Sequence, residues 1–469
     1  MVFSSHLFVF YFLPLVLAAY WLLPSLRWRN RFLAIASYGF YGWANPVFLP
    51  LMLASTVLDY GCGRVVSGDH PRRLRRLAVA ASVVGNLSLL AYFKYAGFLS
   101  ASARGALQAM GWDAVWEPVL EVTLPVGISF YTFQSMSYTL DLYRGRGAPQ
   151  KSFGDFACYV AMFPQLVAGP ILRYREVAEQ LRSRSGSLPA AARGASFFCL
   201  GMAKKVLLAN PCGEIADLCF AASSLRPFDA WIGAFAYGFQ IYFDFSGYSD
   251  MAIGLGLLLG FRFPKNFDSP YRAVSITDFW RRWHISLSAW LRDYLYIPLG
   301  GSRQGRWRTY RNLAVVMLLG GLWHGAAWNF VAWGAFHGGL LAVERWLGIG
   351  QVTSSRWRPL RAAVTFLLVT IGWVLFRADD LPAAGRYLGA MFALQGAPLA
   401  AGLLEGMLYV PYFTLTLAIA ALVTWRAPQT WDWTRSLSPW RAGVALVLFA
   451  SALSFLSTQG HNPFIYFRF

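Results

Sequence analysis

The feature that most constrains this chain is a succession of apolar stretches separated by short clusters of basic residues. Residues 7–24 lead into the arginines of 27–31, and the arginines of 72–76 lead into the apolar residues 77–99. A helix needs about 20 apolar residues to cross roughly 30 Å of hydrocarbon. Only 13% of the residues are charged, against about 25% in a soluble domain. The sequence therefore predicts an integral membrane protein. It excludes a disordered chain and a disulfide-stapled scaffold, and it speaks against a soluble enzyme.

We expect about eleven to thirteen helices, forming one polytopic domain over residues 1–469. The first is a retained helix with an outside N-terminus, because the basic cluster follows it and no small-residue cleavage site does. The polar gaps at 144–154, 173–193 and 350–360 are expected to be loops, and no internal repeat is present. The other expected spans are 32–60 (two short helices, or one broken at Pro46), 77–99, 122–142, 155–172, 194–211, 228–245, 247–261, 313–331, 332–349, 361–377, 384–395, 406–425 and 441–458.

The charge balance fits a membrane protein better than a nucleic-acid-binding protein. There are 41 Lys and Arg against 22 Asp and Glu, a formal net charge of +19. The basic clusters lie beside apolar stretches, where the positive-inside rule and anionic lipid headgroups favour them. We therefore expect membrane lipids, and no nucleic acid, as partners. The five cysteines include no CxxC pair, so neither a metal site nor a disulfide framework is indicated.

One segment departs from the pattern of spans. Residues 262–311 contain ten basic and three acidic residues, a local net charge of +7, and no stretch of spanning length. Within residues 277–295, apolar side chains recur at three- and four-residue steps, while Arg281, Ser288 and Arg292 share another face. This rhythm predicts an amphipathic helix that ends before Pro298 and lies in the interface or inside the protein. A plain interfacial anchor would give the same pattern, but His284 on this helix favours a function.

Two further histidines lie in apolar sequence. His324 stands between glycines in an expected span, and an ionisable side chain at that depth usually faces a cavity or a partner. A neutral imidazole is also the usual general base near neutral pH, although a buried structural histidine remains the alternative. His337 is expected to be structural, in a seam of small residues that lets helices approach closely.

Other polar residues in apolar sequence have simpler interpretations. Asp244 and Asp250 flank Ser246-Gly247. Proton relays use such carboxylates, but we expect these two to cap the two sides of a helix break. Lys94 is expected to extend its ammonium group toward the membrane surface. No nucleotide-binding loop, HExxH or GxSxG motif is present.

The ordered motifs of the chain resemble those of the membrane-bound O-acyltransferase superfamily. The resemblance is most specific at 280–301 (WRRWHISLSAWLRDYLYIPLGG) and 320–325 (GGLWHG). It is closest to the bacterial branch that contains the membrane subunit of alginate O-acetyltransferase. Further matching segments are 1–5, 124–134, 163–171, 243–250, 266–271, 372–377 and 464–469.

This resemblance implies a fold, a reaction and a site. The fold would be an all-α bundle with re-entrant or amphipathic helices around a central funnel, in the bacterial inner membrane. His324 would be the general base, and His284 would orient the thioester or stabilise charge at its carbonyl oxygen. The donor substrate would be cytoplasmic acetyl-CoA, with no bound cofactor and no metal. Weaker candidates for donor or substrate binding are Asn266, Arg281, Arg282 and Trp323.

The resemblance identifies the acceptor of the acyl group less closely than it identifies the reaction. The resemblance implies O-acetylation of an exopolysaccharide, with alginate first. Because the chain is short for that branch, cellulose and peptidoglycan remain open, as does D-alanyl transfer to teichoic acid. A lipid-linked sugar transporter is the alternative of a different class, which the lack of a repeat disfavours. The loops are too short to form a polymer groove. We therefore expect transfer to a periplasmic or membrane-anchored acetyltransferase that then modifies the polysaccharide.

Overall fold

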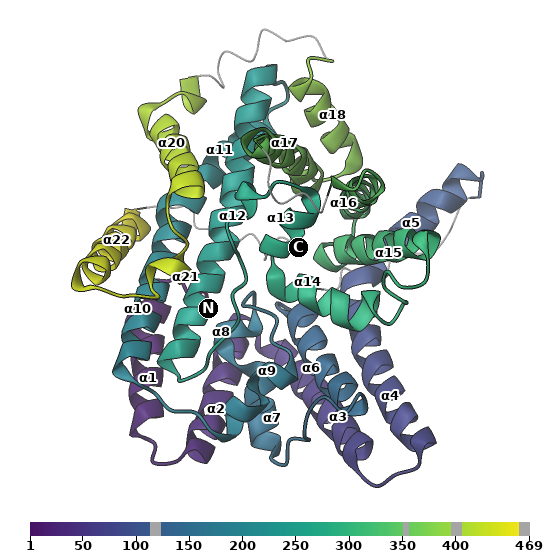
Figure 1. Cartoon of the computed structure of the whole chain (residues 1–469), viewed down its shortest axis with the longest axis vertical. Coiled ribbons are helices and arrows are strands. Elements are labelled where there is room, and N and C mark those ends of the chain that lie inside the picture. The colour runs from purple at the N-terminus through teal and green to yellow at the C-terminus, as the bar shows by residue number, and fades with distance from the viewer. Residues whose placement is uncertain (113–122, 350–355, 395–405, 459–469) are drawn as a thin grey trace. The chain divides into compact units, whose positions relative to one another are not determined.

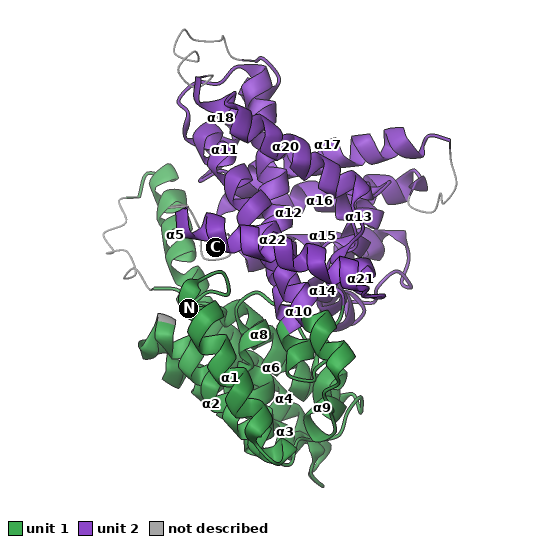
Figure 2. Ribbon diagram, turned by 90° about the vertical axis from the view of Figure 1, so that its left-hand side faces the viewer, with its two compact units in different colours: residues 1–194, 255–264 green, residues 195–254, 265–469 purple. Residues whose placement is uncertain are grey.

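The computed structural model describes residues 1–112, 123–349, 356–394 and 406–458. Throughout these ranges, helices are joined by turns and loops, with no β-strand (Figure 1). The predicted all-α class is therefore confirmed, while the matching segment 464–469 lies outside the described residues. The chain divides into two compact units (Figure 2). Unit 1 comprises residues 1–194 and 255–264, and unit 2 comprises residues 195–254 and 265–469.

Unit 1 consists of helices that are interrupted by short π-helical or 3-10 segments. In chain order its elements are η1 (Phe8–Phe12), α1 (Leu13–Leu22), α2 (Leu26–Ala44), η2 (Pro46–Phe48), α3 (Leu49–Ser67), α4 (Arg72–Leu90), η3 (Ala91–Tyr95), α5 (Ala96–Ala109), α6 (Ile128–Tyr143), α7 (Phe153–Ala161), α8 (Phe163–Leu166), α9 (Tyr174–Arg182) and the start of α10 (Leu188–Ala203).

The interruptions of unit 1 test the predicted boundaries. The break at Pro46 is confirmed, because Asn45 leaves the helical conformation and its side chain accepts a hydrogen bond from the Val47 amide. The predicted span 155–172 is wrong, since α7 ends before Met162 and α8 then begins. Pro164 lies in the first turn of α8, where its missing N–H is tolerated. The predicted loop 173–193 is also wrong, because it contains α9 and the start of α10.

A buried polar cluster joins α3, α4 and α6. The carboxyl group of Asp59 on α3 accepts hydrogen bonds from Ser82 Oγ (2.5 Å) and Asn86 Nδ2 (2.8 Å), both on α4. Ser82 Oγ lies 2.8 Å from Thr139 Oγ1 on α6, and Asn86 Oδ1 accepts a hydrogen bond from Ser55. All five side chains are buried. Because a buried polar group costs free energy unless it is hydrogen-bonded, this cluster fixes the register of the three helices.

Unit 2 carries the segment and the histidines that the sequence singled out. After the end of α10 its elements are η4 (Lys204–Ala209), α11 (Asn210–Ala221), α12 (Pro227–Leu258), η5 (Pro270–Arg272), α13 (Ile276–Arg282), α14 (Ile285–Leu291), η6 (Arg292–Tyr296), α15 (Arg306–His324), α16 (Trp328–Trp346), α17 (Arg358–Arg377), α18 (Leu381–Met391), α20 (Pro411–Arg426), α21 (Thr430–Trp433) and α22 (Pro439–Thr458). The last four residues of α12 belong to unit 1.

The prediction that Asp244 and Asp250 cap a helix break is wrong. Both lie within α12, which runs unbroken for 32 residues. Asp244 pairs with Lys205 (2.9 Å) and Asp250 pairs with Lys204 (2.7 Å), both lysines on η4. The Lys205–Asp244 pair is almost fully enclosed, with side chains 4% and 2% exposed. Opposite charges on the facing helix, rather than helix ends, are what make these carboxylates tolerable in apolar surroundings.

The predicted seam of small residues is confirmed as a close contact between α15 and α16. A Cβ atom on Gly334 would lie 2.4 Å from the carbonyl oxygen of Met317 and 3.1 Å from Cα of Leu318. One on Gly338 would lie 3.3 Å from Cβ of Met317. Gly339, by contrast, has no atom within 4 Å of such a Cβ. The seam therefore lets the two backbones meet on one face of α16 only.

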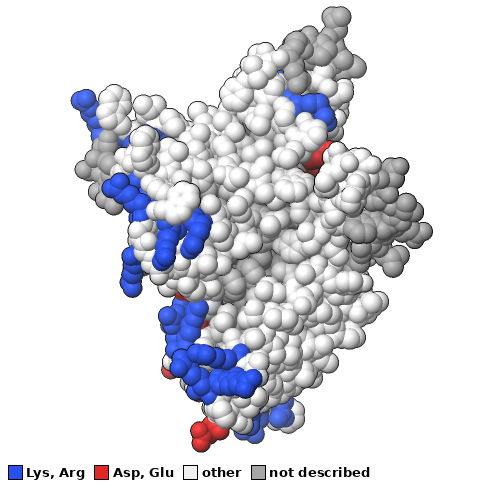
Figure 3. Space-filling model, turned by 90° about the vertical axis from the view of Figure 1, so that its right-hand side faces the viewer, with Lys and Arg blue, Asp and Glu red and all other residues white. Residues whose placement is uncertain are grey.

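Apolar helices and uncharged surface support the predicted membrane location. Among the described residues, four helical stretches are long and apolar enough to cross a membrane, and the helix at Phe8–Leu22 is apolar but shorter. Several other predicted spans fall on short helices, such as the 11 residues of α18. Figure 3 shows a face that is mostly free of charge, with Lys and Arg gathered in groups. The five cysteines are buried and unbridged. The four stretches are Pro46–Ser67, Arg72–Ala109, Arg358–Arg377 and Pro439–Thr458.

Candidate active site

His324 lies at a helix end, where the sequence predicted a continuous helix to residue 331. It is the last residue of α15, and Gly325 leaves the helical conformation, with φ −156° and ψ 148°. A Cβ atom on Gly325 would lie 2.0 Å from the Phe330 ring, so only glycine fits this close turn between α15 and α16. The His324 side chain is buried. Gly325 therefore ends α15 directly after His324.

Among the described residues, the rings of Trp323, Trp333 and Phe376 pack around the imidazole of His324. The ring centroids of Trp323, Trp333 and Phe376 lie 4.9, 5.3 and 5.2 Å from it, and each ring meets it nearly edge to face. These residues come from α15, α16 and α17, respectively. Edge-to-face packing restricts ring rotation. His324 is therefore held in one orientation by its own helix and by α16 and α17.

The amphipathic helix predicted over 277–295 is interrupted at His284. α13 ends at Arg282 and α14 begins at Ile285, and His284 between them has φ 44° and ψ 55°. This left-handed conformation is uncommon for a residue other than glycine, and such strain is concentrated at functional sites. The ring of His284 is fully buried and meets Phe245 of α12 edge to face at 4.6 Å. The prediction that the helical segment ends before Pro298 is confirmed, since η6 ends at Tyr296.

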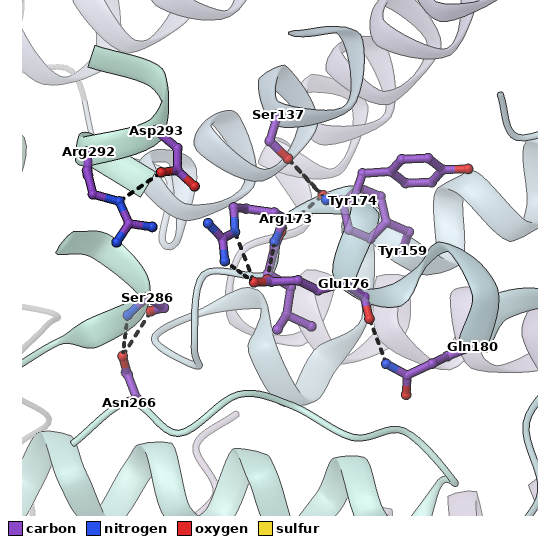
Figure 4. A network of polar contacts seen from close by, with 11 residues as sticks. Ser137, Tyr159, Arg173, Tyr174, Glu176, Gln180, Asn266, Ser286, Arg292 and Asp293 are labelled. Atoms are coloured by element: carbon purple, nitrogen blue, oxygen red, sulfur yellow. Dashed lines mark hydrogen bonds and ion pairs between the residues drawn. The ribbon is translucent and has the colours of Figure 1, made fainter. Parts of the chain in front are cut away.

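Asn266 holds the loop that carries His284. Its backbone carbonyl accepts the Ile285 amide at 2.9 Å, and its Oδ1 accepts both the backbone N–H of Ser286 (3.1 Å) and the Ser286 hydroxyl (2.9 Å) (Figure 4). The same Oδ1 lies 3.3 Å from His284 Nδ1. Asn266 Nδ2 and His284 Nε2 are both buried, and neither has a hydrogen-bond partner among the described residues. Asn266 thus touches His284 directly, rather than standing apart as a separate donor.

Trp323 connects the two histidines. Its ring centroid lies 6.1 Å from that of His284 and 4.9 Å from that of His324. The structure therefore gathers His284, Asn266, Trp323 and His324 in one part of unit 2. Burial lowers the pKa of His284 to about 3, so this ring is neutral at any physiological pH.

A cavity of about 170 Å³ opens beside His324. Apart from the polar atoms of His324, Ser288, Arg292 and a few aromatic rings, its walls are apolar. The sequence had placed Ser288 and Arg292 on one face with Arg281, but the break at His284 separates Arg281 from them. The residues that line the cavity are Trp280, Leu287, Ser288, Leu291, Arg292, Tyr296, Leu313, Val316, Met317, Gly320, His324, Trp333 and Leu341.

The predicted basic residues fall into two groups. Arg282 donates to Asp278 on its own helix (2.8 Å) and to the carbonyl of Asp268 (3.3 Å), so its guanidinium is occupied within the loop. Arg281 is exposed. Arg292 pairs with Asp293 at 2.9 Å, but its side chain is 60% exposed (Figure 4). Of these three arginines, Arg281 and Arg292 are therefore the more accessible to a ligand.

The sequence did not reveal the contact between Glu344 and the start of α13. Its carboxylate, on α16, accepts the backbone amides of Ile276 and Thr277 and the Thr277 hydroxyl, at the first turn of α13. A helix N-terminus favours an acceptor with negative charge. In the sequence, Glu344 is only an acidic residue at the end of an apolar stretch, which is also typical of a membrane edge. Glu344 therefore fixes where α13, and with it the turn to His284, begins.

His337 lies close to the site without entering it. It is fully buried between Trp280 and Trp333, with ring centroids at 5.3 and 5.0 Å. A Cβ atom on Gly372 of α17 would come within 2.9 Å of its Nε2. This packing agrees with the structural role expected for His337. Among the described residues, no group of three His, Cys, Asp or Glu side chains is placed to hold a metal ion.

Comparison with known proteins points to one enzyme family. Residues 149–373 match the family model of membrane-bound O-acyltransferases. The chain is 44% identical to a probable alginate O-acetylase of Pseudomonas putida, over the whole of both chains. It is 49% identical to one of Pseudomonas aeruginosa, over 84% of this chain and 75% of that relative. A peptidoglycan O-acetyltransferase of Helicobacter pylori is 37% identical, over 85% of this chain and 81% of that relative.

Proposed function

Because the chain belongs to the membrane-bound O-acyltransferase family, we propose that it moves an acetyl group from a thioester to a hydroxyl, for O-acetylation of an exopolysaccharide. The names of the relatives favour alginate as that polysaccharide. The Helicobacter pylori relative keeps peptidoglycan as a second candidate. We place the protein in the bacterial inner membrane as a multi-pass chain, with residues 1–469 acting as one acyltransferase domain.

The observation that carries the proposal is the position of His324 in the wall of an apolar cavity. Its imidazole is buried, fixed by three rings, and adjacent to space for a small acyl group. His324 also lies at the C-terminus of α15, the negative end of the helix dipole. That end stabilises the imidazolium that forms when a histidine takes a proton. These are the properties that a general base in acyl transfer requires.

The donor we propose is acetyl-CoA, entering from the cytoplasmic side. Its acetyl group would occupy the cavity, where the apolar walls exclude water from the thioester. The exposed guanidinium groups of Arg292 and Arg281 are suited to the phosphates of coenzyme A. Trp323, whose ring lies between those of the two histidines, would support the imidazole of His324 from outside the cavity lining.

The transfer balances without any further reactant. The hydroxyl oxygen of the acceptor attacks the carbonyl carbon of the thioester while His324 takes the hydroxyl proton. The tetrahedral intermediate collapses with cleavage of the carbon–sulfur bond, and the imidazolium returns the proton to the leaving thiolate. An ester and a free thiol result, and His324 is neutral again.

The immediate acceptor we propose is a hydroxyl group on a separate periplasmic or membrane-anchored acetyltransferase. The connections between the expected spans are short, and an extended polymer needs several sugar subsites. A side-chain hydroxyl is small enough to reach His324, and the partner would then modify the polysaccharide. Acetylation of the polysaccharide by the purified protein alone would contradict this part of the proposal.

The test is reconstitution of the purified protein in lipid vesicles with labelled acetyl-CoA, the candidate partner and the polysaccharide. Removing a general base lowers the rate by about 10²–10⁴-fold, so His324→Ala should lose transfer while accumulating normally in the membrane. His70→Ala is the matched control, because His70 is an exposed histidine in the turn before α4. Transfer by His324→Ala at the wild-type rate would refute the assignment of the base.

A further inference from the structure

The side chain of Asn266 determines which nitrogen of His284 carries a hydrogen atom. The Ser286 backbone N–H faces Asn266 Oδ1 at 3.1 Å. A backbone N–H can only donate, so the amide atom facing it must be the oxygen. The same oxygen lies 3.3 Å from His284 Nδ1. Because an amide oxygen can only accept, the hydrogen lies on Nδ1.

The second polar atom near Nδ1 leads to the same tautomer. Ser286 Oγ lies 3.5 Å from His284 Nδ1 but 2.9 Å from Asn266 Oδ1. A hydroxyl has one hydrogen to give, and Asn266 Oδ1 is the nearer of the two possible acceptors by 0.6 Å (2.9 against 3.5 Å). Ser286 therefore donates to Asn266, and a lone pair of its oxygen is left to face Nδ1.

We infer that His284 meets the substrate as a hydrogen-bond acceptor, through Nε2, and that Asn266 is the positioning residue that keeps it in this form. The inference rests on the proposed acyl-transfer function. A neutral imidazole with its hydrogen on Nδ1 has a lone pair on Nε2. That atom is buried and has no hydrogen-bond partner among the described residues. An unpaired buried acceptor costs free energy, and a donor group of the substrate removes this cost.

This tautomer changes the role of His284 in the reaction. Stabilising charge on the carbonyl oxygen of the thioester requires a hydrogen-bond donor, and Nε2 offers none. The ligand of Nε2 is instead an O–H or N–H group. The acceptor hydroxyl supplies an O–H, and the pantetheine arm of an acyl-CoA supplies an amide N–H. We expect His284 to orient one of these groups, with the Trp323 ring lying between His284 and His324.

Two substitutions of Asn266 separate this role from a merely structural one. Asn266→Asp keeps an oxygen acceptor at Nδ1 and adds a negative charge. Among the described residues, the ring contacts the side chains of Phe245, Trp323, Asn266 and Ser286. None of these is charged, so the new carboxylate would raise the pKa of His284. Asn266→Leu removes the acceptor and lets the ring turn, which should lower kcat/KM by about 10–100-fold, the loss seen when the residue that orients a metal-binding histidine is replaced.

The decisive readout is the pH profile of acetyl transfer. As pH falls, the Asp variant should lose activity at a higher pH than the wild type, because protonated Nε2 can no longer accept. A purely structural role would lower the activity of both variants by the same factor at every pH, and this result would overturn the inference. Melting temperatures show whether either variant fails to fold. Absence of transfer by the wild type would instead overturn the proposed function.

His284→Asn distinguishes the two sources of the donor group. Asparagine tolerates the left-handed conformation at this position, but its shorter side chain cannot place an acceptor where Nε2 lies. A higher KM for the hydroxyl acceptor identifies the O–H, and a higher KM for acetyl-CoA identifies the amide N–H. Unchanged values of both KM and kcat would overturn the inference. ¹⁵N NMR of the labelled protein observes the tautomer directly, because the His284 signal is the one missing from the spectrum of His284→Asn. A signal that showed hydrogen on Nε2 and none on Nδ1 would also overturn the inference.

Discussion

Replacing Gly334 by alanine should disturb His324 from two helical turns away. The new Cβ would lie 2.4 Å from the Met317 carbonyl oxygen, whereas carbon and oxygen normally approach to about 3.3–3.6 Å. α15 and α16 must therefore separate by about 1 Å at this point. Overpacking of this kind lowers the free energy of unfolding by about 1–3 kcal/mol. The higher helix propensity of alanine raises it by about 1 kcal/mol. Since His324 ends α15 and Trp333 lies beside Gly334, the same displacement moves the base relative to the cavity.

The effect on catalysis should exceed the effect on stability. A misplacement of about 1 Å can lower a rate by about 10²-fold, so Gly334→Ala should transfer acetyl groups far more slowly while still reaching the membrane. Gly339→Ala is the matched control, because it lies on the same helix and has no atom within 4 Å of a Cβ. Thermal melting in detergent and transfer in vesicles should be measured for both. If both variants melt and react alike, close approach of α15 and α16 does not position His324.

Three further outcomes follow from contacts in unit 2. Glu344→Ala should lower both the melting temperature and the rate of acetyl transfer, because the first turn of α13 loses its acceptor. Arg345→Ala, at the exposed neighbour, should leave both unchanged. Lys205→Met should destabilise the chain by about 3–5 kcal/mol, since it removes the cation that pairs with the buried Asp244 carboxylate, and Lys205→Met with Asp244→Leu should restore most of that loss. Full stability of the single variant would show that the pair is dispensable. A cysteine in place of Arg303 should react with a membrane-impermeant thiol reagent only after the inner membrane is opened. Labelling of intact cells would contradict a cytoplasmic location of residues 262–311.

Features that depend on neighbouring residues were predictable from the sequence. The break at Pro46, the glycine seam at Gly334 and the apolar setting of His324 all show within a few residues. Each reflects a local rule, such as a helix interrupted at proline or small side chains at a close helix contact. The structure bears out the break and the seam, because each is indicated by the residue types at the position itself, whichever helix packs against it.

Features that depend on distant partners were not predictable. The apolar rhythm of 277–295 continues through His284, so nothing local indicates that the helix breaks there. The break is held by Asn266, 18 residues upstream, and by Glu344, on another helix. Likewise, Asp244 appeared to be a cap because its partner Lys205 lies on a separate element. A single sequence shows none of these long-range pairings.

The Asp59 cluster has a consequence for how the chain enters the membrane during synthesis. A lone aspartate near the centre of an inserting helix costs about 2.5–3.5 kcal/mol, and α3 contains no partner that reaches both carboxyl oxygens. Ser82 and Asn86, which bind them, emerge from the ribosome only with α4. The insertion machinery should therefore retain α3 until α4 arrives and release the two as a hairpin. Shortening the nascent chain before Ser82 should leave α3 uninserted, and Asp59→Leu should let it enter alone.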